Sequence, residues 1–292
     1  MDGGFQIKTP ILHDSRLITD TMKYKLIAVD LDGTLVRNDH TISRFSTDIL
    51  TKAQEKGVKV VICTGRPAYG ARHIAKAIRL EDFGGYVIGY NGGEIIDYSS
   101  GKVIRDLLLP DGIMPQAVKF ADIAGADLMT FCDGQIISTS AMNPIVQRSS
   151  VRNKMEIVKV DDWINQTSNL RLHKCMLVGQ PERLRAIESD VQSTFKEILE
   201  AFCSEPPFLE LTPCGVNKGD GISWLLKHIN METSDVVAFG DTPGDSPMLQ
   251  LAGMGVAMGN APDFMKSAAD AVTLTNEEDG VAVMLEKMLE DA

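Results

Sequence analysis

The sequence of 292 residues has few of the residues that build disulfide frameworks, zinc sites or histidine-based catalytic centres. Its five cysteines are scattered, odd in number and without a C-x-x-C pair, which argues against both a disulfide framework and a zinc site. Its five histidines are equally dispersed, so a histidine metal site and a Ser-His-Asp triad are disfavoured. Any bound metal is therefore expected to have oxygen ligands.

Long apolar runs and an excess of positive charge are also missing. No stretch approaches the roughly 18 apolar residues of a membrane helix, and residues 1–22 lack the apolar segment of a signal peptide. The formal net charge is −11, which disfavours nucleic acid and anionic membranes as partners, because both attract basic surfaces. These features predict a cytoplasmic protein with no nucleic-acid or membrane partner. A small phosphorylated ligand remains open if its charge is compensated locally.

The most informative segment is a short apolar run that ends in two aspartates. Residues 26–29 (LIAV) predict a strand buried on both faces of a parallel sheet, and residues 30–35 (DLDGTL) follow directly. Asp30 and Asp32 are two residues apart, so their side chains point the same way. At about 4 Å and an effective dielectric constant of about 20, their repulsion costs about 4 kcal/mol. The pair needs a cation or a shared proton, unless the segment is a plain acidic turn.

Strands and helices alternate through both ends of the chain. A helix is expected over residues 43–56, a strand over 58–62 with a helix that begins near Pro67, and a strand over 86–90. A helix over 218–229 and a strand over 236–239 resume the pattern. The alternation predicts an α/β fold with a Rossmann-like parallel sheet covered by helices on both faces.

Residues 109–208 do not follow this regular alternation of strands and helices. Short strands are expected over 128–131, 136–138 and 175–178, with helices near 115–124 and 182–195. They predict a smaller α+β unit, for which Pro110 and Pro206-Pro207 are candidate hinges. The expected organisation is an N-terminal extension over 1–22, a core domain over 23–108 and 209–292, and an inserted domain over 109–208.

Polar residues at the strand ends are expected to meet at one edge of the sheet. They are Asp30, Asp32, Thr64, Asn91, Asp241 and Asp245, joined by Lys218 at a helix start. Four carboxylates around one point are untenable alone but suit a hard cation such as Mg²⁺. One Mg²⁺ and one lysine would leave the four aspartates with a single net negative charge. We therefore expect an obligatory Mg²⁺ that screens and bridges the carboxylates and an incoming phosphate.

Four sequence blocks resemble the haloacid dehalogenase superfamily, and most closely its Cof-type phosphatase branch. They are DLDGTL at 30–35, TGR at 64–66, GVNKG at 215–219 and GDTPGDSPML at 240–249, with VAMGNA at 256–261 following. Each block is short, but all four occur in order and at element boundaries. The resemblance covers nearly all of the chain from Lys25 onward and implies a core with an inserted cap that shapes substrate specificity.

The resemblance also implies roles for individual residues. Asp30 would be the nucleophile that forms an aspartyl phosphate, and Asp32 the general acid and base, with a pKa held up by its acidic neighbours. Phosphate or substrate binding would fall to Leu31, Thr64, Gly65, Asn91 and Lys218. The metal ligands would be Asp30, Asp32 through its backbone carbonyl, Asp241 and Asp245. The competing interpretations are an Asp32 that only supports the ligands of the Mg²⁺, a turn for Asn91, a solvated charge for Lys218, a helix cap for Asp241 and a surface acid for Asp245.

Some residues depart from the expected pattern. Gly244 stands where the family usually has an asparagine, which removes an amide that often reaches the phosphate, and Gly93 replaces a common alanine. The glycines at 253, 255 and 259 have the wrong spacing for a dinucleotide fingerprint, and no GxxxxGK[ST] loop is present.

The sequence therefore predicts a magnesium-dependent phosphatase that acts on a small phosphorylated metabolite, such as a sugar phosphate. The alternatives are a sugar phosphomutase of the same superfamily and a receiver-like module that holds phosphoaspartate as a signal. The natural substrate and the choice between a monomer and a homodimer stay open.

Overall fold

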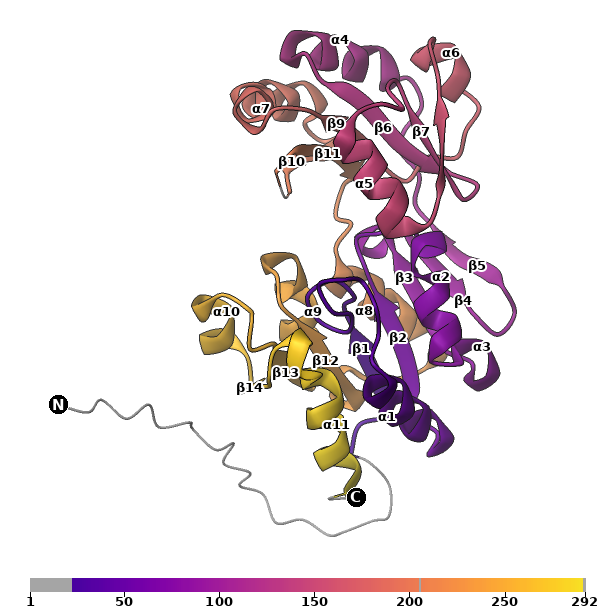
Figure 1. The fold of residues 1–292 in the computed structure, drawn as a ribbon, viewed down its shortest axis with the longest axis vertical. Coiled ribbons are helices and arrows are strands. Elements are labelled where there is room, and N and C mark those ends of the chain that lie inside the picture. The colour runs from indigo at the N-terminus through magenta and orange to yellow at the C-terminus, as the bar shows by residue number, and fades with distance from the viewer. Residues whose placement is uncertain (1–22, 205, 291–292) are drawn as a thin grey trace, which may run out of the picture.

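The computed structural model describes residues 23–204 and 206–290, so the predicted extension over 1–22 lies outside the described residues. These residues form two units, each built on its own sheet (Figure 1). The large unit takes the two ends of the described chain and the small unit takes its middle. No helix in the described ranges is long and apolar enough to cross a membrane.

The large unit contains an eight-stranded sheet in the order β14-β13-β12-β1-β2-β3-β4-β5. The strands from β14 to β3 are parallel, and β4 and β5 add an antiparallel hairpin at one edge. Their bounds are β1 (Leu26–Val29), β2 (Lys59–Cys63), β3 (Tyr86–Gly89), β4 (Glu94–Asp97), β5 (Lys102–Asp106), β12 (Val236–Gly240), β13 (Met254–Ala257) and β14 (Ala271–Val272). The parallel α/β architecture predicted from the alternation is confirmed.

Helices cover both faces of this sheet. α1 (Arg44–Glu55), α2 (Ala68–Ala77) and α11 (Gly280–Glu290) pack on one face, and α8 (Lys218–Ile229), α9 (Ser246–Leu251) and α10 (Asp263–Ala268) pack on the other. The short helix α3 (Leu80–Phe83) follows α2, and 3₁₀ turns lie at Tyr90–Gly92, Thr233–Asp235, Pro243–Asp245 and Asn276–Glu278. Because β1 is buried on both faces, its four residues are fully apolar and do not alternate.

The small unit contains a six-stranded sheet in the order β10-β11-β9-β6-β7-β8. Its strands are β6 (Asp127–Cys132), β7 (Gln135–Ser138), β8 (Glu156–Lys159), β9 (Cys175–Val178), β10 (Leu199–Cys203) and β11 (Phe208–Pro213). α4 (Met114–Ala124), α6 (Trp163–Thr167) and α7 (Pro181–Phe195) pack on one face, and α5 (Pro144–Asn153) packs on the other. The last turn of α5 points toward the large unit in Figure 1 and meets α2 there.

The return from the small unit lies later in the chain than the sequence predicts. β11 pairs with β10 and β9, so residues 209–213 belong to the small sheet and not to the core domain. Pro206-Pro207 lies in the turn between β10 and β11 and is therefore not a hinge between the units. The prediction was wrong because it took the proline pair as the end of the inserted unit, whereas here the pair lies in a turn within that unit.

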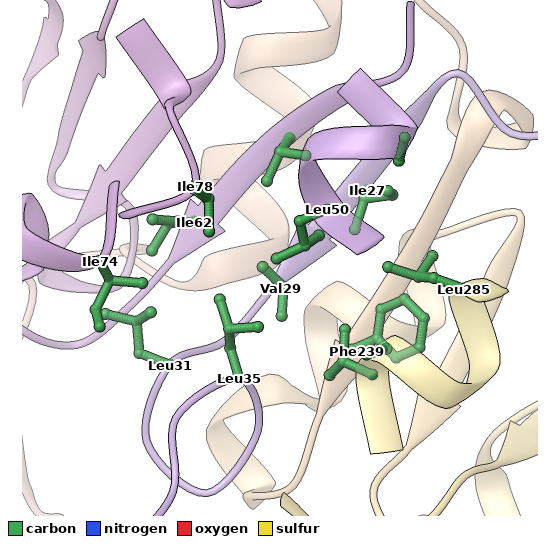
Figure 2. Close-up of a cluster of buried hydrophobic side chains, with 14 of the residues drawn as sticks. Ile27, Val29, Leu31, Leu35, Leu50, Ile62, Ile74, Ile78, Phe239 and Leu285 are labelled. Carbon is green, nitrogen blue, oxygen red and sulfur yellow. The ribbon is translucent and has the colours of Figure 1, made fainter. Parts of the chain in front are cut away.

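The main core of the large unit centres on Phe239, whose side chain is fully buried beside Val29 and Leu285 (Figure 2). These three residues come from β12, β1 and α11, so one side chain joins both ends of the chain. Burial of an aromatic side chain at such a position contributes several kcal/mol to stability.

We expect Phe239→Ala to lower the free energy of unfolding of the large unit by about 3–5 kcal/mol, because it removes the ring and leaves a cavity. Chemical denaturation followed by circular dichroism measures this loss. The matched control is Phe264→Ala, since Phe264 is 60 % exposed on α10. It should change stability by no more than about 0.5 kcal/mol. An equal loss in the two variants would contradict this description of the core.

Candidate active site

The predicted site residues gather at one edge of the large sheet. β1, β2, β3 and β12 are neighbours and run parallel, so their carboxyl ends lie side by side. Asp30 follows β1, Thr64 follows β2, Asn91 follows β3 and Asp241 follows β12. This is the edge at which parallel α/β sheets bind ligands.

Three of the four predicted acidic residues form one cluster. Asp30, Asp241 and Asp245 each offer a carboxylate oxygen, and these oxygens lie within 4.8 Å of one another. Asp30 and Asp245 are buried and Asp241 is partly buried. The side chain of Asp32 is not part of this group. The three clustered carboxylate oxygens are ligands of the kind that a hard divalent cation prefers.

Lys218 joins two members of this cluster. Its Nζ donates to Oδ1 of Asp30 at 2.6 Å and to Oδ1 of Asp245 at 2.5 Å. Burial alone lowers the pKa of Lys218, but the two carboxylates outweigh it and raise the pKa above its usual range. Lys218 is the first residue of α8, and the side chain of Asn217 caps that helix by accepting from the Asp220 N–H. The helix start therefore holds the ammonium in place.

The loop after β12 fixes the two other carboxylates. Oδ2 of Asp245 accepts from the backbone N–H groups of Asp241 and Thr242 and from the Thr242 hydroxyl. Asp241 accepts from the Thr34 hydroxyl at 2.8 Å and from the Asn260 amide at 3.3 Å. Asp245 is thus a fully buried residue of the site and not a surface acid.

Burial makes the anionic forms of this cluster costly without a cation. It raises the pKa of Asp30 to about 8, although the Lys218 ammonium opposes the rise. It raises the pKa of Asp241 to about 6, and the hydrogen bond from Thr34 opposes that rise. A bound cation would reverse both shifts, because a nearby positive charge favours the ionised carboxylate.

Asp32 lies beside the cluster but faces cations. Arg66 binds both of its oxygens, through Nε at 2.7 Å and through Nη2 at 2.5 Å, and Arg152 binds Oδ2 at 2.7 Å. Burial on its own raises the pKa of Asp32, but the two guanidinium groups outweigh it and hold the pKa well below its usual range. The prediction that acidic neighbours keep this pKa high was therefore wrong. The sequence shows that Asp30 is near Asp32, but it does not show that Arg152 of the small unit contacts Asp32.

The remaining predicted residues line the neighbouring loops. Thr64 is buried, and its backbone carbonyl accepts from the Asn91 N–H at 2.9 Å. A Cβ on Gly65 would lie 3.1 Å from Oδ1 of Asn91, so these two residues are in close contact. The Leu31 side chain is buried in the hydrophobic core, which leaves only its main chain for a ligand.

Several polar residues at this site were not predicted from the sequence. Thr34 and Asn260, which hold Asp241, lie inside two of the quoted blocks, so their position was available but their role was not. Arg66 also lies in a quoted block. Arg152 and Lys174 come from the small unit and from no block, and Lys174 donates to the Gly65 carbonyl at 3.2 Å. No sequence signal identifies these two residues.

A cavity of about 520 Å³ lies at the junction of the two units. Its walls include Tyr69 and Tyr90 from the large unit and Phe131 and His173 from the small unit. Tyr90 and His173 stack with ring centroids 4.4 Å apart. None of the predicted site residues lines this cavity, so the cavity does not contain the carboxylate cluster.

Comparisons with known proteins agree with this geometry. The family model of haloacid dehalogenase-like hydrolases matches residues 27–285. The chain is 32 % identical over 261 residues to a 5-amino-6-(5-phospho-D-ribitylamino)uracil phosphatase of Bacillus subtilis, covering 88 % of this chain and 93 % of that protein.

Solved structures give the same result. A haloacid dehalogenase-like hydrolase from Bacteroides thetaiotaomicron aligns with a TM-score of 0.88 and 39 % identity, covering 91 % of this chain and 100 % of that one. A sugar phosphatase of haloacid dehalogenase subclass IIB aligns with a TM-score of 0.75 and 25 % identity, covering 90 % and 98 %. These comparisons confirm the expected class of enzyme, a phosphoric monoester hydrolase. The chain belongs to the haloacid dehalogenase-like hydrolases, in their Cof-type branch of phosphatases.

Proposed function

We propose that this phosphatase hydrolyses a small phosphorylated metabolite with Mg²⁺, through an aspartyl phosphate on Asp30. One observation carries the proposal: Asp30, Asp241 and Asp245 converge within 4.8 Å while Lys218 contacts two of them. A purely structural cluster would not need three carboxylates around a single ammonium. The arrangement suits a site that receives both a cation and a phosphate.

The residues present fit Mg²⁺. Carboxylate oxygens of Asp30, Asp241 and Asp245 would hold it, and the backbone carbonyl of Asp32 is a further candidate ligand. When bound, Mg²⁺ would supply positive charge that brings the anionic phosphate and the anionic nucleophile together. Thr34 and Asn260 fix the orientation of Asp241 for this role.

Asp30 would then act on phosphorus. Its carboxylate oxygen forms a bond to phosphorus while the ester P–O bond breaks, and the departing oxygen takes a proton from Asp32. For this step Asp32 would have to leave Arg66 and Arg152, which hold it ionised in the described structure, and take up a proton first. Water next attacks the aspartyl phosphate and gives a proton to Asp32, and the bond between phosphorus and Asp30 breaks to release phosphate. Lys218, which contacts Asp30, would bind the oxygens of the transferring group together with Thr64 and the Gly65 N–H.

The small unit would act as the cap over this site. Its Lys174 and Arg152 already reach the Gly65 carbonyl and Asp32 of the large unit. Such contact excludes bulk water and lets cap residues choose the leaving group. The sugar phosphatase of subclass IIB supports a sugar phosphate or a similar metabolite as substrate. A phosphomutase would return the phosphoryl group to the substrate, so released inorganic phosphate separates the two activities.

We expect Asp30→Asn to lower Mg²⁺-dependent phosphate release from a panel of phosphorylated metabolites by about 10³-fold or more, because the amide is a poor nucleophile. A colorimetric phosphate assay with Mg²⁺ and with EDTA measures this. The control Asp48→Asn makes the same change at an exposed position of α1 and should stay within about twofold of wild type. Equal turnover by Asp30→Asn and wild type would refute Asp30 as nucleophile.

A pair of glycine variants tests the cation site. Gly33 and Gly57 both have positive φ, +79° and +88°, so alanine carries a similar backbone cost at either position. A Cβ on Gly33 would lie 2.3 Å from Oδ2 of Asp241, whereas a Cβ on Gly57 meets nothing within 4 Å. Gly33→Ala should raise the half-activating Mg²⁺ concentration about 10-fold or more, while Gly57→Ala leaves it unchanged. Identical Mg²⁺ titrations of the two variants would contradict a metal ligand at Asp241.

The departure at Gly244 gives a further prediction. This position is exposed, and a Cβ there would meet only the Thr242 hydroxyl, at 3.6 Å, so a side chain fits. We expect Gly244→Asn to lower KM about 2–10-fold by adding one hydrogen bond to the phosphate. Gly244→Leu, of similar size but without an amide, should not lower KM. An unchanged or higher KM in Gly244→Asn would show that the missing amide is not what limits phosphate binding.

A further inference from the structure

The loop that follows β2 is fastened to the end of β3 by main-chain hydrogen bonds. The Thr64 carbonyl accepts from the Asn91 N–H at 2.9 Å, and the Arg66 carbonyl accepts from the Tyr90 N–H at 2.9 Å. These bonds fix the peptide groups before and after the Gly65–Arg66 peptide. That central peptide is held by side chains instead.

Lys174 of the small unit binds the carbonyl of this central peptide. Its Nζ donates to the Gly65 carbonyl at 3.2 Å, and the Arg66 N–H of the same peptide donates to the Thr64 hydroxyl oxygen at 3.1 Å. The peptide is therefore held at both of its polar groups. Because the Thr64 oxygen accepts this bond, its hydroxyl hydrogen is the part that can donate to a ligand.

The small unit holds Lys174 firmly before it meets the loop. The Lys174 side chain is 7 % exposed, and Nζ also donates to Oε2 of Glu210 at 3.1 Å. The Ser204 hydroxyl donates to the other oxygen of Glu210 at 2.7 Å, and the Thr130 hydroxyl donates to the Lys174 carbonyl at 2.5 Å. A side chain that is already ordered loses little conformational entropy when it binds the Gly65 carbonyl.

We propose that Lys174 is a positioning residue of the phosphate site. The proposal rests on the proposed function, in which Thr64 and the Gly65 N–H bind the transferring group. Lys174 acts through the main chain of Gly65 and not on the phosphate itself. Without it the Gly65–Arg66 peptide loses a charge-assisted hydrogen bond, and the groups that would bind the phosphate lose their fixed direction.

This role couples the docking of the small unit to the binding of phosphate. Lys174 directly precedes β9 and Glu210 lies in β11, so both belong to the small sheet and move with it. A swing of the small unit away from the large unit would take the ammonium from Gly65 and loosen the loop. Docking and phosphate binding therefore favour each other.

A charge-balanced double variant tests this role. Lys174→Met alone would leave Glu210 buried without its cation, so we pair it with Glu210→Gln. We expect Lys174→Met/Glu210→Gln to lower kcat/KM for p-nitrophenyl phosphate about 10-fold or more and to raise the inhibition constant of inorganic phosphate about 10-fold. Lys174→Arg keeps a charged donor and should retain part of both. Lys174→Met/Glu210→Leu makes the same test with an apolar pair, a replacement that buried ion pairs often tolerate.

Two control variants separate the contact with Gly65 from the ion pair. Glu210→Gln weakens the ion pair but leaves Lys174 beside Gly65, so both constants should stay within about threefold of wild type. Lys159→Met/Asp161→Asn removes an exposed ion pair from the same unit and should change neither constant.

Amide hydrogen exchange distinguishes positioning from direct contact with phosphate. In the unliganded enzyme, the Arg66 N–H should exchange about 5-fold or more faster in the double variant than in wild type, because its peptide is no longer held. An ammonium that served only as a ligand of the phosphate would leave this rate unchanged. Exchange followed by nuclear magnetic resonance measures the rate.

The outcomes separate this role from the proposed function. A folded double variant with the wild-type inhibition constant for phosphate would overturn the role of Lys174 and leave the phosphatase proposal standing. An equal loss in Glu210→Gln, or an unchanged exchange rate of the Arg66 N–H, would have the same meaning. No Mg²⁺-dependent hydrolysis of p-nitrophenyl phosphate or of the metabolite panel by wild type would overturn both proposals.

Discussion

The contact between the Lys218 ammonium and two buried carboxylates is the interaction on which the rest of the site depends. Its partners Asp30 and Asp245 are 188 and 27 residues away in sequence. A buried carboxylate without a partner is strongly disfavoured. Asp30 and Asp245 can therefore be buried together at one sheet edge only if the positive charge of Lys218 lies beside them. The fold brings these three residues together, and the Lys218 ammonium offsets the free-energy cost of burying the two carboxylates.

Much of this arrangement follows from local sequence patterns. The apolar run before Asp30 and the buried run before Asp241 predict parallel strands, and parallel neighbours bring their carboxyl ends to one edge. The antiparallel hairpin β4–β5 was not predicted, because most of its residues are exposed or only partly buried and show a weak apolar pattern. The boundary near Pro206-Pro207 was misplaced for a related reason, since proline marks a turn without telling which elements it joins.

The pKa of Asp32 shows most clearly what short stretches of this sequence cannot predict. A pattern of residues identifies which carboxylates lie near one another along a loop, but a pKa depends on every charge that the fold delivers. Arg152 reaches Asp32 from a helix in the other unit, so its effect exists only once both units are docked. Features that depend on the contact between the units therefore require the structure.

The return path from the small unit has a mechanical consequence. Only Cys214–Asn217 connects β11 to α8, and a Cβ on Gly92 would lie 2.7 Å from the Asn217 carbonyl, so the last of these residues is already fastened to the large unit. Any swing of the small unit must therefore be absorbed within Cys214–Val216 on this side. During such a swing the Lys218 ammonium would keep its contacts with Asp30 and Asp245, whereas the contact of Arg152 with Asp32 would be lost.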